Sequence, residues 1–146
     1  MNKMNNYIKI EFPSKSSNEG FARAAVGAFA SQLDLTCEEL ADIKTAVSEA
    51  VTNSIVHGYT DTNGIIEISC LISDNKIEIK VVDYGKGIED IELAMQPLYS
   101  SIPGEERSGM GFTVMESFMD TLQVDSAIDN GTTVKMTKRI GFDVYA

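Results

Sequence analysis

The sequence has no tryptophan, one histidine, three prolines and two cysteines among its 146 residues. It has no apolar run near the roughly 18–20 residues of a membrane-spanning helix, and its first residues, MNKMNNYIKIEF, lack the apolar block of a signal peptide. The two thiols, Cys37 and Cys70, have no metal-type spacing, so we expect them to be reduced. These absences favour a cytoplasmic protein over a secreted or membrane one.

Positive charge is also scarce, because 12 Lys and Arg face 22 Asp and Glu, for a net charge of −10. Nucleic-acid binding needs clustered cations against the phosphates, so no nucleic-acid partner is expected. An acidic protein of this kind suits a partner with a basic protein surface.

Three common catalytic and nucleotide-binding motifs are missing. His57 is the only histidine and is expected at the surface or at a helix end. It cannot be both base and nucleophile, so a Ser-His-Asp hydrolase is not expected. No G-x-x-x-x-G-K-[ST] sequence is present, and no G-x-G-x-x-G follows a strand in a βαβ unit. A P-loop is therefore excluded, and a dinucleotide-binding Rossmann site is not expected.

The order of apolar patterns predicts one α+β domain over 1–146. Alternation predicts strands at residues 7–12, 64–73, 76–83, 121–126 and 132–139. Helical spacing and capping signals predict helices from Ser16 to about residue 33, and over 36–58, 88–94 and 111–119. Residues 96–108 read as a long functional loop. We expect a mixed, mainly antiparallel sheet with the helices layered on one face.

The helix predicted over 36–58 is the element on which the site depends. Thr36 and Glu39 form a capping box, as Ser16 and Glu19 do for the preceding helix, and Gly58 is expected as the C′ glycine. Glu49 and Asn53, four residues apart, lie on one side of the helix, well away from its apolar stripe. That apolar stripe is Leu40, Ile43, Val47, Ala50, Val51 and Ser54. A solvated helix face is the alternative reading of Glu49 and Asn53.

Two glycine-containing turns add to this helix. Asp83 ends a strand directly before Gly85 and Gly87, where a buried carboxylate could accept a hydrogen bond from the amino group of adenine. A simple turn cap is the alternative for Asp83. The stretch from Gly109 to Gly111 precedes a helix and could present backbone N–H groups to phosphates, although an ordinary loop-to-helix junction has the same pattern.

The order and spacing of these motifs resemble the GHKL superfamily, which includes gyrase, the Hsp90 chaperones, histidine kinases and MutL. The series is E-x-x-x-N on a helix, D-x-G-x-G after a strand, S-G-M-G-F at a helix start and G-T-T in the last hairpin. The match covers about residues 36–139. It implies the Bergerat-type ATP-binding α/β sandwich of that superfamily, with ATP or ADP and Mg²⁺ as cofactors.

Within the superfamily the sequence is most similar to the small anti-sigma serine kinases. The strings that carry this similarity are FARAAVGAF, SEAVTNSIVHGY, VVDYGKGI, QPLYSS and ERSGMGFTVMESFMD. The resemblance implies an ATP-dependent protein serine kinase that inhibits the sporulation sigma factor F and phosphorylates a serine of its anti-anti-sigma factor. A stress-response sigma B kinase, a non-catalytic ATP-holding anti-sigma module and a histidine kinase fragment remain alternatives.

The resemblance implies roles for three side chains along the nucleotide. The carboxylate of Glu49 would be the general base toward the substrate serine. The amide oxygen of Asn53 would ligate Mg²⁺, which takes its other ligands from phosphates and water. Asp83 would bind the adenine amino group, supported by Gly85, Gly87 and the hydroxyl of Thr132.

The remaining implied residues hold phosphates or partners. Backbone donors at Gly109, Met110 and Gly111 would face the phosphates. Residues 99–108 would form a lid, with Ser101 and Arg107 near the nucleotide.

The implied partners are sigma factor F, the anti-anti-sigma factor and a second copy of the chain in a homodimer. The residues implied in partner binding are Arg23, Glu106 and Arg107.

Overall fold

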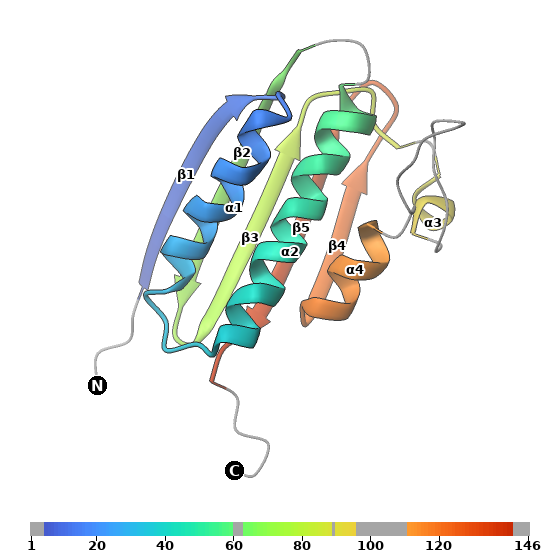
Figure 1. The fold of residues 1–146 in the computed structure, drawn as a ribbon. Coiled ribbons are helices and arrows are strands. Elements are labelled where there is room, and N and C mark those ends of the chain that lie inside the picture. The colour runs from blue at the N-terminus through green and yellow to red at the C-terminus, as the bar shows by residue number, and fades with distance from the viewer. Residues whose placement is uncertain (1–4, 60–62, 89, 96–110, 142–146) are drawn as a thin grey trace.

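The computed structural model of the protein describes residues 5–59, 63–88, 90–95 and 111–141. Its centre is a five-stranded sheet in the order β1–β2–β3–β5–β4 (Figure 1). The strands are β1 Asn5–Pro13, β2 Ile65–Ser73, β3 Lys76–Asp83, β4 Thr121–Ser126 and β5 Thr132–Arg139. All four pairings of these strands are antiparallel, so the parallel component allowed by the sequence-based prediction is not found among them.

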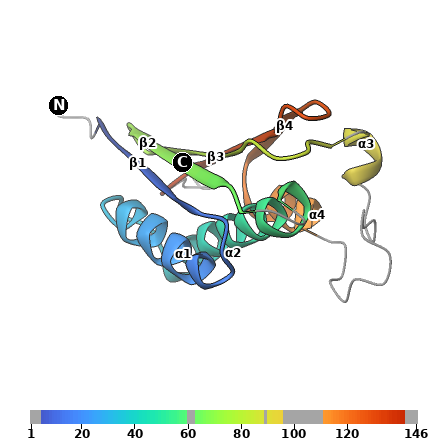
Figure 2. The same cartoon turned by 90° about the horizontal axis from the view of Figure 1, so that it is seen from above.

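The helices cover one face of this sheet, as predicted. They are α1 Ser17–Ala30, α2 Cys37–Asn53 and α4 Gly111–Phe118, and the π-helical turn η1 Ser54–Gly58 continues α2. The short helix α3 Ile91–Ala94 lies to the side of this layer (Figure 2). Figure 2 shows α1, α2 and α4 together on one side of the sheet. The α+β architecture is therefore confirmed. No helix in the described parts of the chain is both long and apolar enough to cross a membrane.

The core lies between the sheet and this helix layer, because β2 and β3 alternate between buried and more exposed positions. The two strands bury Ile66, Ile68, Cys70, Ile72, Ile77, Ile79 and Val81. From α2 and η1 the buried residues are Ile43, Ala46, Val47, Ala50, Val51 and Ser54, close to the predicted stripe. Burying one Val or Ile side chain contributes about 1.5–3 kcal/mol. The shared burial fixes α2 in place over the sheet, where it contacts β3.

The same alternation carries Asp83 to the core side of the sheet. Ile77, Ile79 and Val81 point toward the helices, and Asp83 is the next residue of β3 with that orientation. It lies opposite Ile66 of β2 and opposite Thr132 of β5. An acidic side chain is thus placed at the rim of an apolar core, between two neighbouring strands.

Two helix N-termini were expected to have capping boxes, and one of them does. At α2 the amide of Glu39 donates to the Thr36 hydroxyl (3.0 Å), and the amide of Thr36 donates to the Glu39 carboxylate (2.8 Å). At α1 the prediction was wrong, because Ser16 makes no side-chain capping bond. Its backbone is already helical (φ −54°, ψ −34°), whereas a capping residue is normally extended.

The predicted C′ role of Gly58 was also wrong. The positive-φ glycines of the described chain are Gly87, Gly131 and Gly141, and the chain at Gly58 instead completes the π turn, in which Tyr59 N donates to Ser54 O (3.1 Å). A Cβ atom at position 58 would lie 3.0 Å from the Asp83 carboxylate. Glycine stands here because the helix end and the buried acid approach so closely.

The two helix starts give a matched test of the fold. Thr36→Ala removes a cap bond and should lower the free energy of unfolding by about 1 kcal/mol. Ser16→Ala removes no such bond and should change it by less than about 0.5 kcal/mol. Urea unfolding followed by circular dichroism measures both. Equal losses for the two variants would contradict this assignment of the caps.

Candidate functional site

Asp83 is the most buried charged group of the candidate site, with 3% of the residue exposed. The Ser54 hydroxyl donates to its Oδ2 (2.8 Å) and the Gly85 amide donates to its Oδ1 (3.0 Å). The backbone of Thr132, opposite it in the sheet, gives a further hydrogen bond. The carboxylate is therefore held by one group from η1, one from the glycine turn and one from β5.

These bonds leave the carboxylate partly unsatisfied. A carboxylate offers about four acceptor positions, and Ser54, Gly85 and Thr132 occupy three of them. Burial raises the pKa of Asp83 above its ordinary value, and the three hydrogen bonds oppose this rise. Asp83 can accept one more hydrogen bond, from a ligand with an N–H group.

The glycine turn after Asp83 is clamped between two other segments. A Cβ atom on Gly85 would lie 2.0 Å from the carbonyl oxygen of Gly58, and one on Gly87 would lie 2.0 Å from the carbonyl oxygen of Ala127. Gly87 also has a φ of 77°, which only glycine adopts without strain. The sharp turn predicted from the sequence is present. The close neighbours of both glycines are protein backbone, which gives a structural reason for them independent of any base.

Thr132 lies beside Asp83 but its hydroxyl is already in contact with the protein. The Thr132 Oγ1 and Ser126 Oγ atoms are 2.8 Å apart, and either can be the donor. Ser126 also accepts from the amide of Ile88 (2.7 Å) and donates to the carbonyl of Gly131 (2.8 Å). A hydroxyl has only one proton, so when Ser126 donates to Gly131, Thr132 donates to Ser126 and can only accept from a ligand.

Glu49 and Asn53 face the start of α4. A Cβ atom added to Gly111 would lie 3.1 Å from Asn53 Nδ2 and 3.2 Å from both Asn53 Oδ1 and Glu49 Oε2. Both side chains are half-buried rather than fully solvated, which disfavours the alternative of a solvated helix face. Since a helix N-terminus attracts anions, the oxygen atoms of Glu49 and Asn53 border a place suited to phosphate.

The donor set here fits magnesium. Mg²⁺ prefers oxygen ligands and usually binds proteins through one or two of them, with phosphate and water for the rest. The amide oxygen of Asn53 is a ligand of that kind, and the carboxylate of Glu49 lies on the same side of Gly111. In the described parts of the chain no group of three or more His, Cys, Asp and Glu could hold a metal ion.

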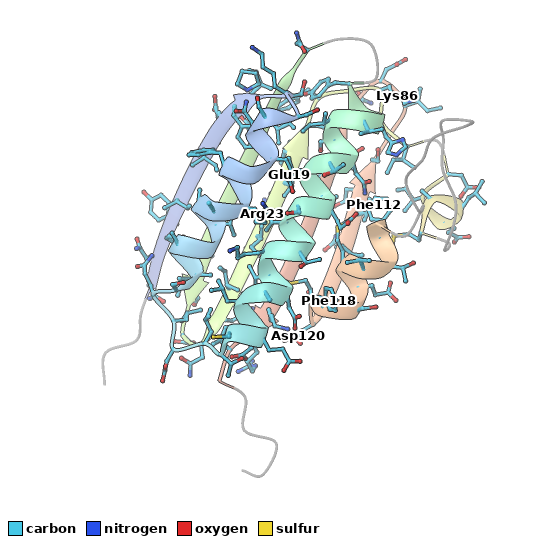
Figure 3. All side chains as sticks on the ribbon, viewed as in Figure 1. Glu19, Arg23, Lys86, Phe112, Phe118 and Asp120 are labelled. Carbon is cyan, nitrogen blue, oxygen red and sulfur yellow. The ribbon has the colours of Figure 1, made fainter. Side chains whose placement is uncertain are left out.

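Several predicted residues lie elsewhere. Figure 3 shows Glu19 and Arg23 on α1, and Phe112 on α4, with α2 between the two helices. The Arg23 guanidinium lies 3.5 Å from the Glu19 carboxylate, and its side chain is 46% exposed. Five further predicted residues, and the proposed lid over 99–108, lie outside the described residues: Ser101, Glu106, Arg107, Gly109 and Met110. Their roles stay predictions.

The sequence analysis missed Ser54 and Tyr59. Ser54 was counted with the apolar stripe of α2, although a hydroxyl on such a stripe is itself a signal of a buried polar partner. The Tyr59 hydroxyl accepts from the amide of Tyr84 (2.6 Å) and donates to the carbonyl of Ile65 (2.8 Å). No local pattern in the sequence indicates these two contacts.

The fold and the site define a histidine kinase-like ATPase domain, and the family model of that description matches residues 12–138. An anti-sigma F factor of Thermoanaerobacter sp. (strain X514) is 63% identical over 138 residues, which is 94% of this chain and 96% of the relative. An anti-sigma F factor of Clostridium novyi is 61% identical over 136 residues, 92% of this chain and 95% of the relative. The chain belongs to the anti-sigma F factor family.

Solved structures show the same fold at low sequence identity. The RsbU and RsbW domains of a Mycobacterium tuberculosis protein match with a TM-score of 0.68 at 21% identity, over 92% of this chain and 32% of that one. The mycobacterial sensor histidine kinase MprB matches with a TM-score of 0.58 at 17% identity, over 91% of this chain and 98% of that one. The fold is thus shared with both of these proteins.

The raised pKa of Asp83 predicts how pH affects nucleotide binding. An adenine amino group donates to the ionised carboxylate, so protons compete with ATP, and affinity should fall as the pH drops through the raised pKa. ITP has a carbonyl oxygen in place of that amino group, so protonated Asp83 can donate to it. Titration calorimetry between pH 8 and pH 5 should show a larger loss of affinity for ATP than for ITP, because the two nucleotides share the same titrating phosphates.

Asp83→Asn is the control for this measurement, because its side chain does not titrate. It should bind ATP more weakly by about 10–100-fold, as expected for a lost hydrogen bond to a charged group, and its affinities for ATP and ITP should fall in parallel with acid. The account of Asp83 is wrong if ATP and ITP weaken in parallel in the unmodified protein.

Proposed function

We propose that this protein is an ATP-dependent anti-sigma factor kinase. It binds and inhibits the sporulation sigma factor F, and it transfers the terminal phosphoryl group of ATP to a serine of an anti-anti-sigma factor. Membership of the anti-sigma F factor family supports the first activity. The histidine kinase-like ATPase domain supports the second.

One observation carries the nucleotide assignment. Asn53 and Ser54 are consecutive residues, where α2 passes into η1. Ser54 holds the buried Asp83 carboxylate, and Asn53 faces Gly111 at the start of α4. The end of α2 therefore contacts both Asp83, an acceptor suited to adenine, and the start of α4, which attracts anions. ATP lying between these two groups would reach both.

In the proposed reaction the chain's residues position the substrate and move one proton. Asp83 accepts from the adenine amino group, and the N-terminus of α4 faces the phosphates. The serine oxygen of the partner attacks the terminal phosphorus, the bond to the bridging oxygen breaks, and ADP leaves. The Glu49 carboxylate takes the serine proton. Bound magnesium, held by Asn53, would neutralise charge on the phosphates.

We propose that partner proteins contact the exposed part of α1. Arg23 is exposed and pairs with Glu19 on the same helix, an arrangement that a partner carboxylate can replace at little cost. Glu106 and Arg107 are proposed to contact the same partners. The proposed assembly is a cytoplasmic homodimer that holds one sigma factor.

Glu49→Gln tests the catalytic assignment. The amide cannot take the serine proton, so the phosphorylation rate of the anti-anti-sigma factor should fall by about 10²–10⁴-fold. Its affinity for ATP should stay within about threefold, because the base contributes in the transition state rather than in binding. Phosphoserine formation with labelled ATP and magnesium measures the rate, and calorimetry measures the affinity.

Glu38→Gln is the matched control, since Glu38 is an exposed carboxylate in the first turn of the same helix. It should phosphorylate the partner at nearly the unmodified rate. If the unmodified protein binds ATP and the sigma factor yet forms no phosphoserine, the protein is a nucleotide-holding binding module and the kinase proposal is wrong.

A further inference from the structure

Tyr59 occupies an unusual place between two strands. It follows η1 directly, and the residue is only 9% exposed. Its hydroxyl accepts a hydrogen bond from the amide of Tyr84 (2.6 Å) and donates one to the carbonyl of Ile65 (2.8 Å). A side chain from the helix layer therefore satisfies one backbone group at the end of β3 and one at the start of β2.

The register shows what this hydroxyl replaces. Ile66 pairs with Asp83 at the end of the β2–β3 ladder, so Ile65 and Tyr84 would be the next opposed pair. In an antiparallel ladder such a pair can join the amide of one residue directly to the carbonyl of the other. Here the Tyr59 hydroxyl stands between those two groups. The ladder consequently ends at Asp83, and the chain beyond it is free to leave the sheet.

The ring of Tyr59 is fixed on several sides. A Cβ atom on Gly64 would lie 2.2 Å from its Cε1 atom, so the ring packs directly on the Gly64 backbone. Gly64 is itself held by Ser14, whose hydroxyl accepts from the Gly64 amide (2.9 Å). Burial raises the pKa of Tyr59, which keeps the hydroxyl protonated and able to donate to Ile65.

The separation of the strands determines where the glycine turn lies. Tyr84 connects Asp83 to Gly85. The α-carbon of Gly85 packs against Gly58, and its amide donates to Asp83 Oδ1. A shift of Tyr84 toward Ile65 would draw this turn away from Gly58. The geometry of the Asp83 carboxylate thus depends on a hydroxyl that does not touch it.

We propose that Tyr59 is a positioning residue for base recognition, whose hydroxyl parts β2 from β3 and so aims the remaining acceptor position of Asp83 at an exocyclic amino group. This inference rests on the proposed nucleotide-binding function. Removing the hydroxyl either closes the Tyr84 amide onto Ile65 or leaves both groups unpaired. In each case the turn whose Gly85 amide holds the Asp83 carboxylate moves.

Tyr59→Phe tests the proposal through selectivity rather than affinity alone. The preference for ATP over ITP measures how well Asp83 engages the amino group, because the two nucleotides share their sugar and phosphates. We expect the variant to lose about tenfold in affinity for ATP, as for one misplaced hydrogen bond. Its affinity for ITP should stay within about twofold, as expected for unchanged phosphate contacts. Calorimetry at pH 7.5 with magnesium gives both values.

Two further variants sharpen the test. Tyr7→Phe makes the same chemical change at a tyrosine that is 75% exposed on β1, and it should leave the ATP preference unchanged. Gly64→Ala keeps the Tyr59 hydroxyl but pushes on its ring, and it should lower the preference as Tyr59→Phe does. Circular dichroism and thermal unfolding establish that each variant is folded before its binding is compared.

The outcomes separate this inference from the function on which it rests. If the unmodified protein binds no ATP, the proposed function is overturned. If it prefers ATP and Tyr59→Phe retains the full preference, the positioning role alone is overturned. Parallel losses for ATP and ITP in Tyr59→Phe would show a purely structural role for the hydroxyl, and would also overturn it.

Discussion

The carboxylate of Asp83 is buried at the end of the central strand β3, where water no longer solvates its charge. Strand alternation places it there. Every second side chain of β3 points toward the core, and Asp83 takes the next such position, where an apolar residue would be expected. Ser54, Gly85 and Thr132 replace part of the lost hydration, and one acceptor position remains. A folded core normally avoids such a group. Its presence is understandable when a ligand completes the set of donors.

Much of the surrounding backbone is arranged to keep that carboxylate in place. The helix end at Gly58 approaches it so closely that a side chain there would collide with it, and Gly85 packs against the same helix end. The hairpin between β4 and β5 closes the other side through Ala127 and Gly87. Glycines at these positions serve contacts between segments that are far apart in the sequence. The helix that ends at Gly58 also carries Asn53, so the base site and the phosphate site share one element.

Sequence patterns that span a few residues predicted the strands and the main helices well. Alternation located the strands, helical spacing located α2, and four-residue spacing put Glu49 and Asn53 on one side of it. Contacts across the fold were not predictable in the same way. Nothing near Tyr59 in the sequence indicates that its hydroxyl bonds to residues of two strand ends. Gly58 resembles a helix-capping residue in the sequence, but glycine is needed there because the Asp83 carboxylate lies so close. These contacts depend on where the end of α2 and η1 lies against the sheet, which no pattern of a few residues sets.

A crystal structure with a non-hydrolysable ATP analogue and magnesium tests the central claim most directly. We expect the adenine amino nitrogen within hydrogen-bonding distance of an Asp83 carboxylate oxygen, with Ser54, Gly85 and Thr132 keeping the bonds they have now. The phosphates should lie toward Asn53 and the start of α4. An analogue bound elsewhere, or one whose base makes no contact with Asp83, would contradict the account.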